Sequence, residues 1–359
     1  MIFLVLNVLF NALMLTVPFI IPNLYMHQFT YSVMYNCIFS YVIVASLTLI
    51  GYTRLSTSFI GLFSPGRKLI GREEKQLAPL FESVLERMNN KYGTTYKRED
   101  FRLRVSDSKV LNAFALGYNT ITINRGCFTR FSDGQLQALL AHELAHIYYK
   151  DSVRLIALIY GSFGTRMVMW IFAIVCFIQR ICSGITYMSM FSRSGRGVGA
   201  FSAFLGYGLL ILFLPVYILN WVGSKVFYLF SKKISRITEY RADEFAASLG
   251  YKAELISVLE IFDESENNDN SFQSKLMATH PATMLRVGAL EDGVTQKDKL
   301  GSVLSMVPGA EKIVGKTDNT SVFQLGLVLV IIGLLYSGLN IFAYAYNSAL
   351  ITNLKILVF

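Results

Sequence analysis

The 359-residue sequence is too apolar for an ordinary soluble protein: 53% of its residues are hydrophobic and 16% are charged, against about 25% charged in a typical soluble domain. Its 27 Phe and 20 Tyr exclude a disordered chain, which is poor in aromatic residues. The net charge of +9 comes with no basic stripe or nucleic-acid motif, so it indicates the orientation bias of membrane proteins and not nucleic-acid binding.

Two apolar runs open the chain, at residues 2–22 and 34–52, and residues 1–53 contain no Asp, Glu, Lys or Arg. A helix that crosses a hydrocarbon core of about 30 Å needs about 20 such residues. The first run has neither the basic start nor the A-x-A cleavage site of a signal peptide. We therefore expect residues 1–53 to form a transmembrane hairpin.

Residues 54–154 are polar and carry several signals of secondary structure. Apolar side chains recur at helical spacing within residues 73–90, and residues 119–124 (NTITIN) alternate like a strand. Ser132 followed by Gln135 resembles a capping box that opens a helix. This segment is predicted to be the first half of a soluble domain.

The next apolar runs, residues 155–179 and 197–224, predict a second transmembrane hairpin over residues 155–224, joined by a loop at 180–196. Arg166 interrupts the first of them, where it either faces a polar cavity or marks the membrane boundary. Residues 225–318 are polar again and predict the second half of the soluble domain, with an exposed loop at 264–271. A fifth run at 322–346 predicts a further helix within residues 319–359, and the sequence leaves open whether it spans.

Basic residues flank the second and fourth runs on the side of the polar segments: Arg54, Arg67, Lys68, Arg72, Lys225, Lys232, Lys233 and Arg236. Because loops rich in Lys and Arg stay in the cytoplasm, both polar segments are expected there. The loop at 180–196 would then lie outside although it holds Arg180, Arg193 and Arg196, which leaves open that the third and fourth runs form a pair that does not fully cross.

The chemistry is concentrated in residues 141–147 (AHELAHI), which contain the pattern His-Glu-x-x-His. On a helix, His142 and His146 share one face and can bind one Zn²⁺, while Glu143 can act as the general base. A zinc hydrolase needs a third protein ligand. Residues 235–246 (SRITEYRADEFA) offer Glu239 for that position, and Asp243, one turn later, can orient a ligand histidine through its second ring nitrogen.

The pair of motifs resembles the membrane gluzincins, which comprise the HtpX-like heat-shock proteases and the CAAX prenyl endoproteases. Residues 112–117 (NAFALG) and 279–287 (THPATMLRV) resemble two further elements of that family. The resemblance implies a mainly α integral membrane protein: a helical gluzincin metalloprotease domain with a small edge-strand β element, joined to transmembrane hairpins. It also implies one zinc ion bound by His142, His146 and Glu239, with Glu143 activating the water and Asp243 orienting a ligand.

The same resemblance implies that His280 and Arg286 lie near the site, where they either stabilise the oxyanion or help to position this region. It further implies a peptide-binding strand edge formed by the following residues: Asn112, Ala113, Phe114, Thr120, Ile121, Thr122 and Ile123. The expected function is an HtpX-like endopeptidase that cleaves misfolded or membrane polypeptides on the cytoplasmic side of a bacterial inner membrane. A CAAX endoprotease and a non-catalytic membrane scaffold are the alternatives, and the oligomeric state stays open.

Overall fold

The computed structural model describes residues 2–23, 29–63, 66–189, 191, 196–268, 283–292 and 326–335. Within these residues the chain is mainly helical with one small sheet, which confirms the predicted fold class. The chain divides into two compact units. The first, or membrane unit, comprises Met1–Tyr52, Ala157–Leu229 and Thr320–Phe359, and the second, or site unit, comprises Thr53–Ile156 and Phe230–Asn319.

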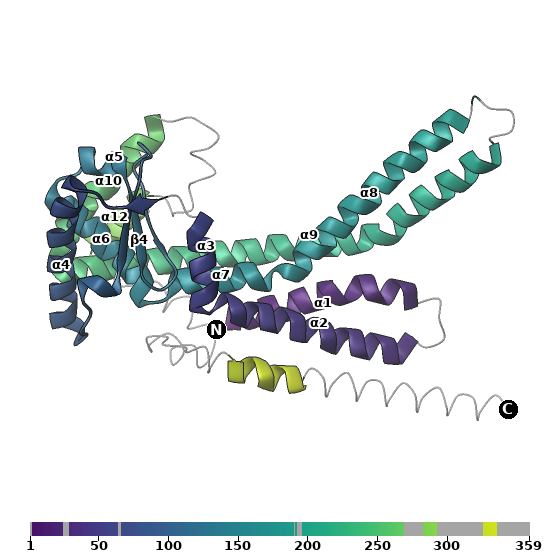
Figure 1. Cartoon of the computed structure of the whole chain (residues 1–359), viewed down its shortest axis with the longest axis horizontal. Coiled ribbons are helices and arrows are strands. Elements are labelled where there is room, and N and C mark those ends of the chain that lie inside the picture. The colour runs from purple at the N-terminus through teal and green to yellow at the C-terminus, as the bar shows by residue number, and fades with distance from the viewer. Residues whose placement is uncertain are drawn as a thin grey trace. The chain divides into compact units, whose positions relative to one another are not determined.

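In the membrane unit, α1 (Ile2–Asn23) and α2 (Phe29–Gly51) pack side by side (Figure 1). Both helices also contact α8 (Phe163–Ser189). Among the described residues, two helical stretches are each long and apolar enough to cross a membrane, Asp151–Ser189 and Gly197–Leu229. The pair Tyr35–Gly51 and Arg54–Leu62 meets the same criterion only when taken together. The protein is thus a membrane protein, as its composition predicts.

The predicted loop at 180–196 is wrong over its first ten residues, because α8 continues to Ser189. Apolar side chains recur after Arg180 at helical spacing, at Ile181, Ile185 and Met188, and all three are exposed. A single arginine does not end a helix that has no proline and whose apolar face continues.

Close packing joins α1 to α8 inside the membrane unit. The Asn11 side-chain carbonyl accepts hydrogen bonds from the Thr165 backbone N–H at 2.9 Å and from the Thr165 hydroxyl at 2.5 Å. A Cβ atom added at Gly164 would lie 1.9 Å from the Asn11 carbonyl oxygen. Only glycine fits at this crossing, as is common where small residues let two membrane helices approach.

The fifth predicted run is described only over a ten-residue helix, Gly326–Leu335. The Tyr41 hydroxyl of α2 donates a hydrogen bond of 2.6 Å to the Leu329 carbonyl oxygen of this helix. The rest of the run lies outside the described residues.

The site unit contains a four-stranded sheet in the order β1-β2-β4-β3, formed by β1 (Arg67–Lys68), β2 (Arg102–Ser106), β3 (Ala113–Leu116) and β4 (Thr120–Asn124). Strand β4 pairs antiparallel with β3 and parallel with β2. Gly117, with a φ of 64°, makes the left-handed turn of the β3–β4 hairpin. Among the described strands, β3 is therefore an edge strand and β4 is not.

The helices that lie within this unit include α3 (Arg54–Phe63), α4 (Arg72–Tyr92), α5 (Arg125–Arg130), α6 (Asp133–Tyr148), α10 (Lys252–Asn268) and α12 (Thr283–Glu291). The unit also contains the start of α7 (Asp151–Gly161) and the end of α9 (Arg196–Ala246). Helix α6 contacts β3 and β4, and α4 and α10 pack on α6 (Figure 1). The shared core includes Phe81 of α4, Ile121 of β4, Leu140 of α6 and Leu255 of α10, all almost fully buried. Because α10 runs to Asn268, the predicted loop at 264–271 is wrong for its first five residues.

Candidate metal centre

Helix α6 carries the two histidines, and its start is fixed by the predicted capping box. The Ser132 hydroxyl accepts a hydrogen bond from the Gln135 N–H at 3.3 Å, and the Gln135 side chain accepts one from the Ser132 N–H at 2.8 Å. One turn apart on this helix, His142 is buried and His146 is half-buried, and their Nε2 atoms lie 3.3 Å from each other.

The third donor comes from α9 (Arg196–Ala246), the helix that also contains the apolar stretch Gly197–Leu229. The Glu239 carboxylate oxygens lie 3.4 Å from His142 Nε2 and 3.7 Å from His146 Nε2. All three donor atoms fall within 4.8 Å of one another. Neighbouring ligands of a tetrahedral Zn²⁺ lie roughly 3.3 Å apart, given metal–ligand distances of about 2.0–2.1 Å. The donor set therefore fits zinc.

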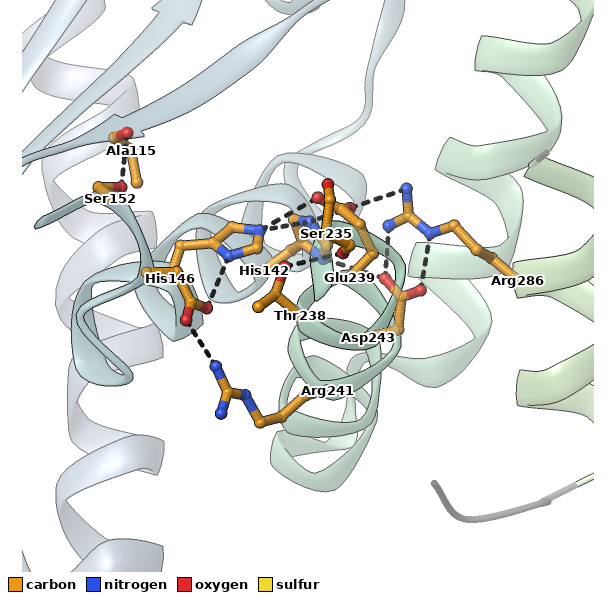
Figure 2. Close-up of polar contacts among 11 residues, drawn as sticks. Ala115, His142, His146, Ser152, Ser235, Thr238, Glu239, Arg241, Asp243 and Arg286 are labelled. Carbon is orange, nitrogen blue, oxygen red and sulfur yellow. Dashed lines mark hydrogen bonds and ion pairs between the residues drawn. The ribbon is translucent and has the colours of Figure 1, made fainter. Parts of the chain in front are cut away.

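A carboxylate–arginine pair lies at the Nδ1 side of the His142 ring. His142 Nδ1 lies 3.0 Å from Asp243 Oδ1. Asp243 in turn accepts hydrogen bonds of 2.7 and 2.6 Å from Nε and Nη2 of Arg286, on α12. Arg286 Nη1 also lies 3.2 Å from Glu239 Oε2 (Figure 2). The buried arginine thus pairs with two carboxylates of α9, that of the proposed ligand Glu239 and that of Asp243, which faces His142.

A second pair supports His146 in the same manner. His146 Nδ1 lies 3.2 Å from Asp151 Oδ2, and the other oxygen of Asp151 accepts a hydrogen bond of 2.6 Å from Arg241 Nη2 (Figure 2). The Arg241 guanidinium lies 4.1 Å from the centre of the Tyr149 ring, within cation–π range. Neither Asp151 nor Arg241 was predicted from the sequence as a site residue. The available signal was an aspartate at the start of the helix that follows His-Glu-x-x-His.

The carboxylates govern protonation at the centre. Burial alone would lower the pKa of His142, but Asp243 and Glu239 outweigh it and raise that pKa to about 10. Burial likewise opposes ionisation of Asp243, yet Arg286 and His142 hold the pKa of its carboxyl below the usual range. Because a metal binds the neutral imidazole, a proton on His142 competes directly with a metal ion.

The predicted substrate residues fall into two groups. Asn112 precedes β3, and its carbonyl accepts a hydrogen bond of 2.9 Å from the Asn124 N–H. Ala113 is buried and Phe114 is half-buried on the edge strand β3. The outer strand reaches the neighbourhood of the centre, since the Ser152 hydroxyl, next to Asp151, donates a hydrogen bond of 2.8 Å to the Ala115 carbonyl (Figure 2).

The prediction that Thr120, Ile121, Thr122 and Ile123 offer a free strand edge is wrong. Their strand β4 is paired on both sides, because β2 occupies the position that the prediction left open. Ile121, Thr122 and Ile123 are completely buried. His280, also predicted to lie near the site, falls outside the described residues.

Comparisons with known proteins point to one family. The profile described as "Peptidase family M48" matches residues 75–294, more than half of the chain. Protease HtpX of Shewanella oneidensis is 28% identical over 206 residues, which cover 52% of this chain and 66% of that protein. Protease HtpX of Alcanivorax borkumensis is 30% identical over 171 residues, which cover 46% and 51%. The chain thus spans between half and two thirds of these relatives' length.

Among solved structures, the crystal structure of S. mikatae Ste24p matches with a TM-score of 0.39 at 18% sequence identity. The match covers 75% of this chain and 59% of that one. A likeness at this level supports no statement about the fold.

Proposed function

Because the chain belongs to peptidase family M48, we propose that it is an HtpX-like, zinc-dependent endopeptidase of the membrane. The single observation that carries this proposal is the convergence of His142, His146 and Glu239, from two separate helices, with donor atoms within 4.8 Å of one another. In the proposal these three residues hold one zinc ion. When bound, the ion would polarise the scissile carbonyl and lower the pKa of a water molecule.

The proton transfers fall to Glu143, which follows His142 on α6 and is buried. As general base it takes the proton of the attacking water, and it then returns this proton to the leaving amine. Asp243 and Asp151 fix the orientation of the two histidines by facing their Nδ1 atoms. Arg286 acts through the carboxylates of Asp243 and Glu239, with which it pairs. Of the two roles expected for Arg286, this position supports the positioning role, and His280 is the proposed candidate for the oxyanion contact.

The proposed substrates are polypeptides, taken as extended chains along β3. An edge strand can bind a peptide by backbone hydrogen bonds with little demand on its sequence, and β3 is paired on one side only among the described strands. This suits the removal of misfolded or membrane proteins. The basic residues that flank the spans favour several crossings of a bacterial inner membrane, with the site unit in the cytoplasm.

The substitution Glu143→Gln tests the proposal. We expect it to keep one zinc per chain, measured by elemental analysis, and to lose about 10²–10⁴-fold in turnover of an unfolded polypeptide, because it removes the base but no metal ligand. Glu86→Gln, on the exposed face of α4, is the matched control and should match the parent protein. Near-normal turnover by Glu143→Gln would remove the general base from the mechanism.

The same assay separates the alternative enzyme. A CAAX endoprotease would cleave a prenylated peptide in preference to an unfolded membrane protein, and an HtpX-like endopeptidase would show the opposite preference. A non-catalytic scaffold would cleave neither, whether or not zinc is present.

A further inference from the structure

We infer that α3 is a lipid-binding surface of the site unit, whose exposed apolar face lies at the boundary between the headgroups and acyl chains of a phospholipid bilayer. The inference concerns where the protein touches the membrane and does not rest on the proposed catalytic activity.

The face is narrow and strongly apolar. Leu55 and Leu62 each expose 78% of their surface and Phe59 exposes 55%. At about 100° per residue, these three side chains fall within roughly 60° of the helix circumference. Arg54 and Ser58 are exposed on one border of this arc. A soluble surface rarely gathers such side chains without a binding role, and an apolar arc with a polar border is typical of helices that lie in the membrane surface.

Other parts of α3 attach it to the sheet. The Gly61 carbonyl accepts a hydrogen bond of 3.3 Å from Arg104 Nη1 of β2. The Arg54 guanidinium lies 5.8 Å from the ring centre of Tyr118, in the turn between β3 and β4. Ser56 is buried. These contacts use the backbone and polar side chains of α3, and they leave Leu55 and Leu62 facing outward.

Continuity of the chain identifies the occupant of the face as lipid. The apolar helix α2 ends at Gly51 and α3 begins at Arg54, so at most about 10 Å of extended chain separates them. Helix α2 itself exposes large apolar side chains, including Phe39 at 61% and Val42 at 53%, as a lipid-facing helix does. The exposed arc of α3 therefore starts where an apolar helix of the membrane unit stops.

Spin labels on the full chain in vesicles of phosphatidylethanolamine and phosphatidylglycerol test the inference. The label is placed at Leu55→Cys and Leu62→Cys, with Ser58→Cys at the border of the arc. Glu86→Cys on α4 serves as the water reference and Phe177→Cys on α8 as the lipid reference. The parent protein supplies the background from native cysteines. The measured quantity is the ratio of collisions with oxygen to collisions with a water-soluble nickel chelate.

We expect ratios at positions 55 and 62 between those of the two references, with a lower ratio at position 58. A ratio equal to that at position 86 would overturn the inference, because the face would then lie in water. A ratio equal to that at position 177 would also overturn it, because α3 would then lie among the acyl chains as a continuation of the α2 span. Spin–spin broadening that vanishes on dilution with unlabelled protein would assign the face to a second copy of the chain.

Discussion

Each proposed zinc histidine faces an aspartate that is itself held by an arginine. His142 faces Asp243, which pairs with Arg286. His146 faces Asp151, which pairs with Arg241. In both His–Asp–Arg series the carboxylate fixes the orientation and the tautomer of the histidine ring, so that Nε2 keeps its lone pair for the metal. The arginines keep the aspartates ionised and in place, and all four supporting residues come from helices other than α6, namely α7 (Asp151–Gly161), α9 and α12.

The contact between His146 and Asp151 gives a prediction about zinc affinity, which is measured separately from catalysis. Asp151→Asn should weaken zinc binding by about 10–100-fold, the usual effect of removing such a supporting carboxylate. The measurement is competition for zinc with a chromophoric chelator, together with the melting temperature of the metal-depleted protein as a check on folding. Asp107→Asn, an exposed aspartate that pairs with Arg67, is the control and should leave zinc affinity unchanged. Unaltered zinc affinity in Asp151→Asn would refute the supporting role.

The helices and strands that could be predicted from the sequence are those whose sequence patterns are local. The cap at Ser132, the stripe of α4 and the alternation of β4 are each decided by neighbours within one or two turns, and the structure has all three. Strand β2 was missed although Leu103 and Val105 alternate with arginines. Its parallel pairing with β4 depends on residues about 18 positions away, which no short window shows. Without β2, one side of β4 had no predicted partner, so β4 was wrongly predicted to be an edge strand.

The crossing of α1 and α8 predicts that alanine substitutions at two glycines of α8 change the melting temperature by different amounts. Gly164→Ala should lower the melting temperature of the detergent-solubilised protein, because its Cβ would collide with the Asn11 backbone. Gly184→Ala on α8 is the matched control, since a Cβ there meets nothing within 4 Å. It should be neutral or slightly stabilising, as alanine favours helix over glycine. Equal effects of the two changes would show that the helices do not approach closely at Gly164.

For the whole molecule, metal removal should act on stability as well as on activity. A ligand that binds only the folded state stabilises it by about 2.7 kcal/mol when its free concentration is 100-fold above its dissociation constant. A chelator should therefore lower the melting temperature of the parent protein. His146→Ala, which lacks one donor, should show no zinc-dependent shift. A shift of the same size in that variant would place the zinc elsewhere.

The zinc-dependent shift should also grow between about pH 6 and pH 8. The raised pKa of His142, about 10, stabilises the metal-depleted protein below the unfolded value of about 6.5, and this contribution is lost as the pH rises towards 10. Zinc meets less competition from protons over the same range. Melting temperatures with zinc and with chelator, recorded at both pH values, check the sign. A shift that shrinks as the pH rises would contradict it.

The division of the site unit into two stretches, Thr53–Ile156 and Phe230–Asn319, has a consequence for synthesis. His146 leaves the ribosome 93 residues before Glu239. At about 5–20 residues per second, that interval lasts roughly 5–20 s. In between, the ribosome makes α8 and the apolar part of α9. The nascent chain therefore holds only two of the three proposed zinc ligands, His142 and His146, until both helices have been made.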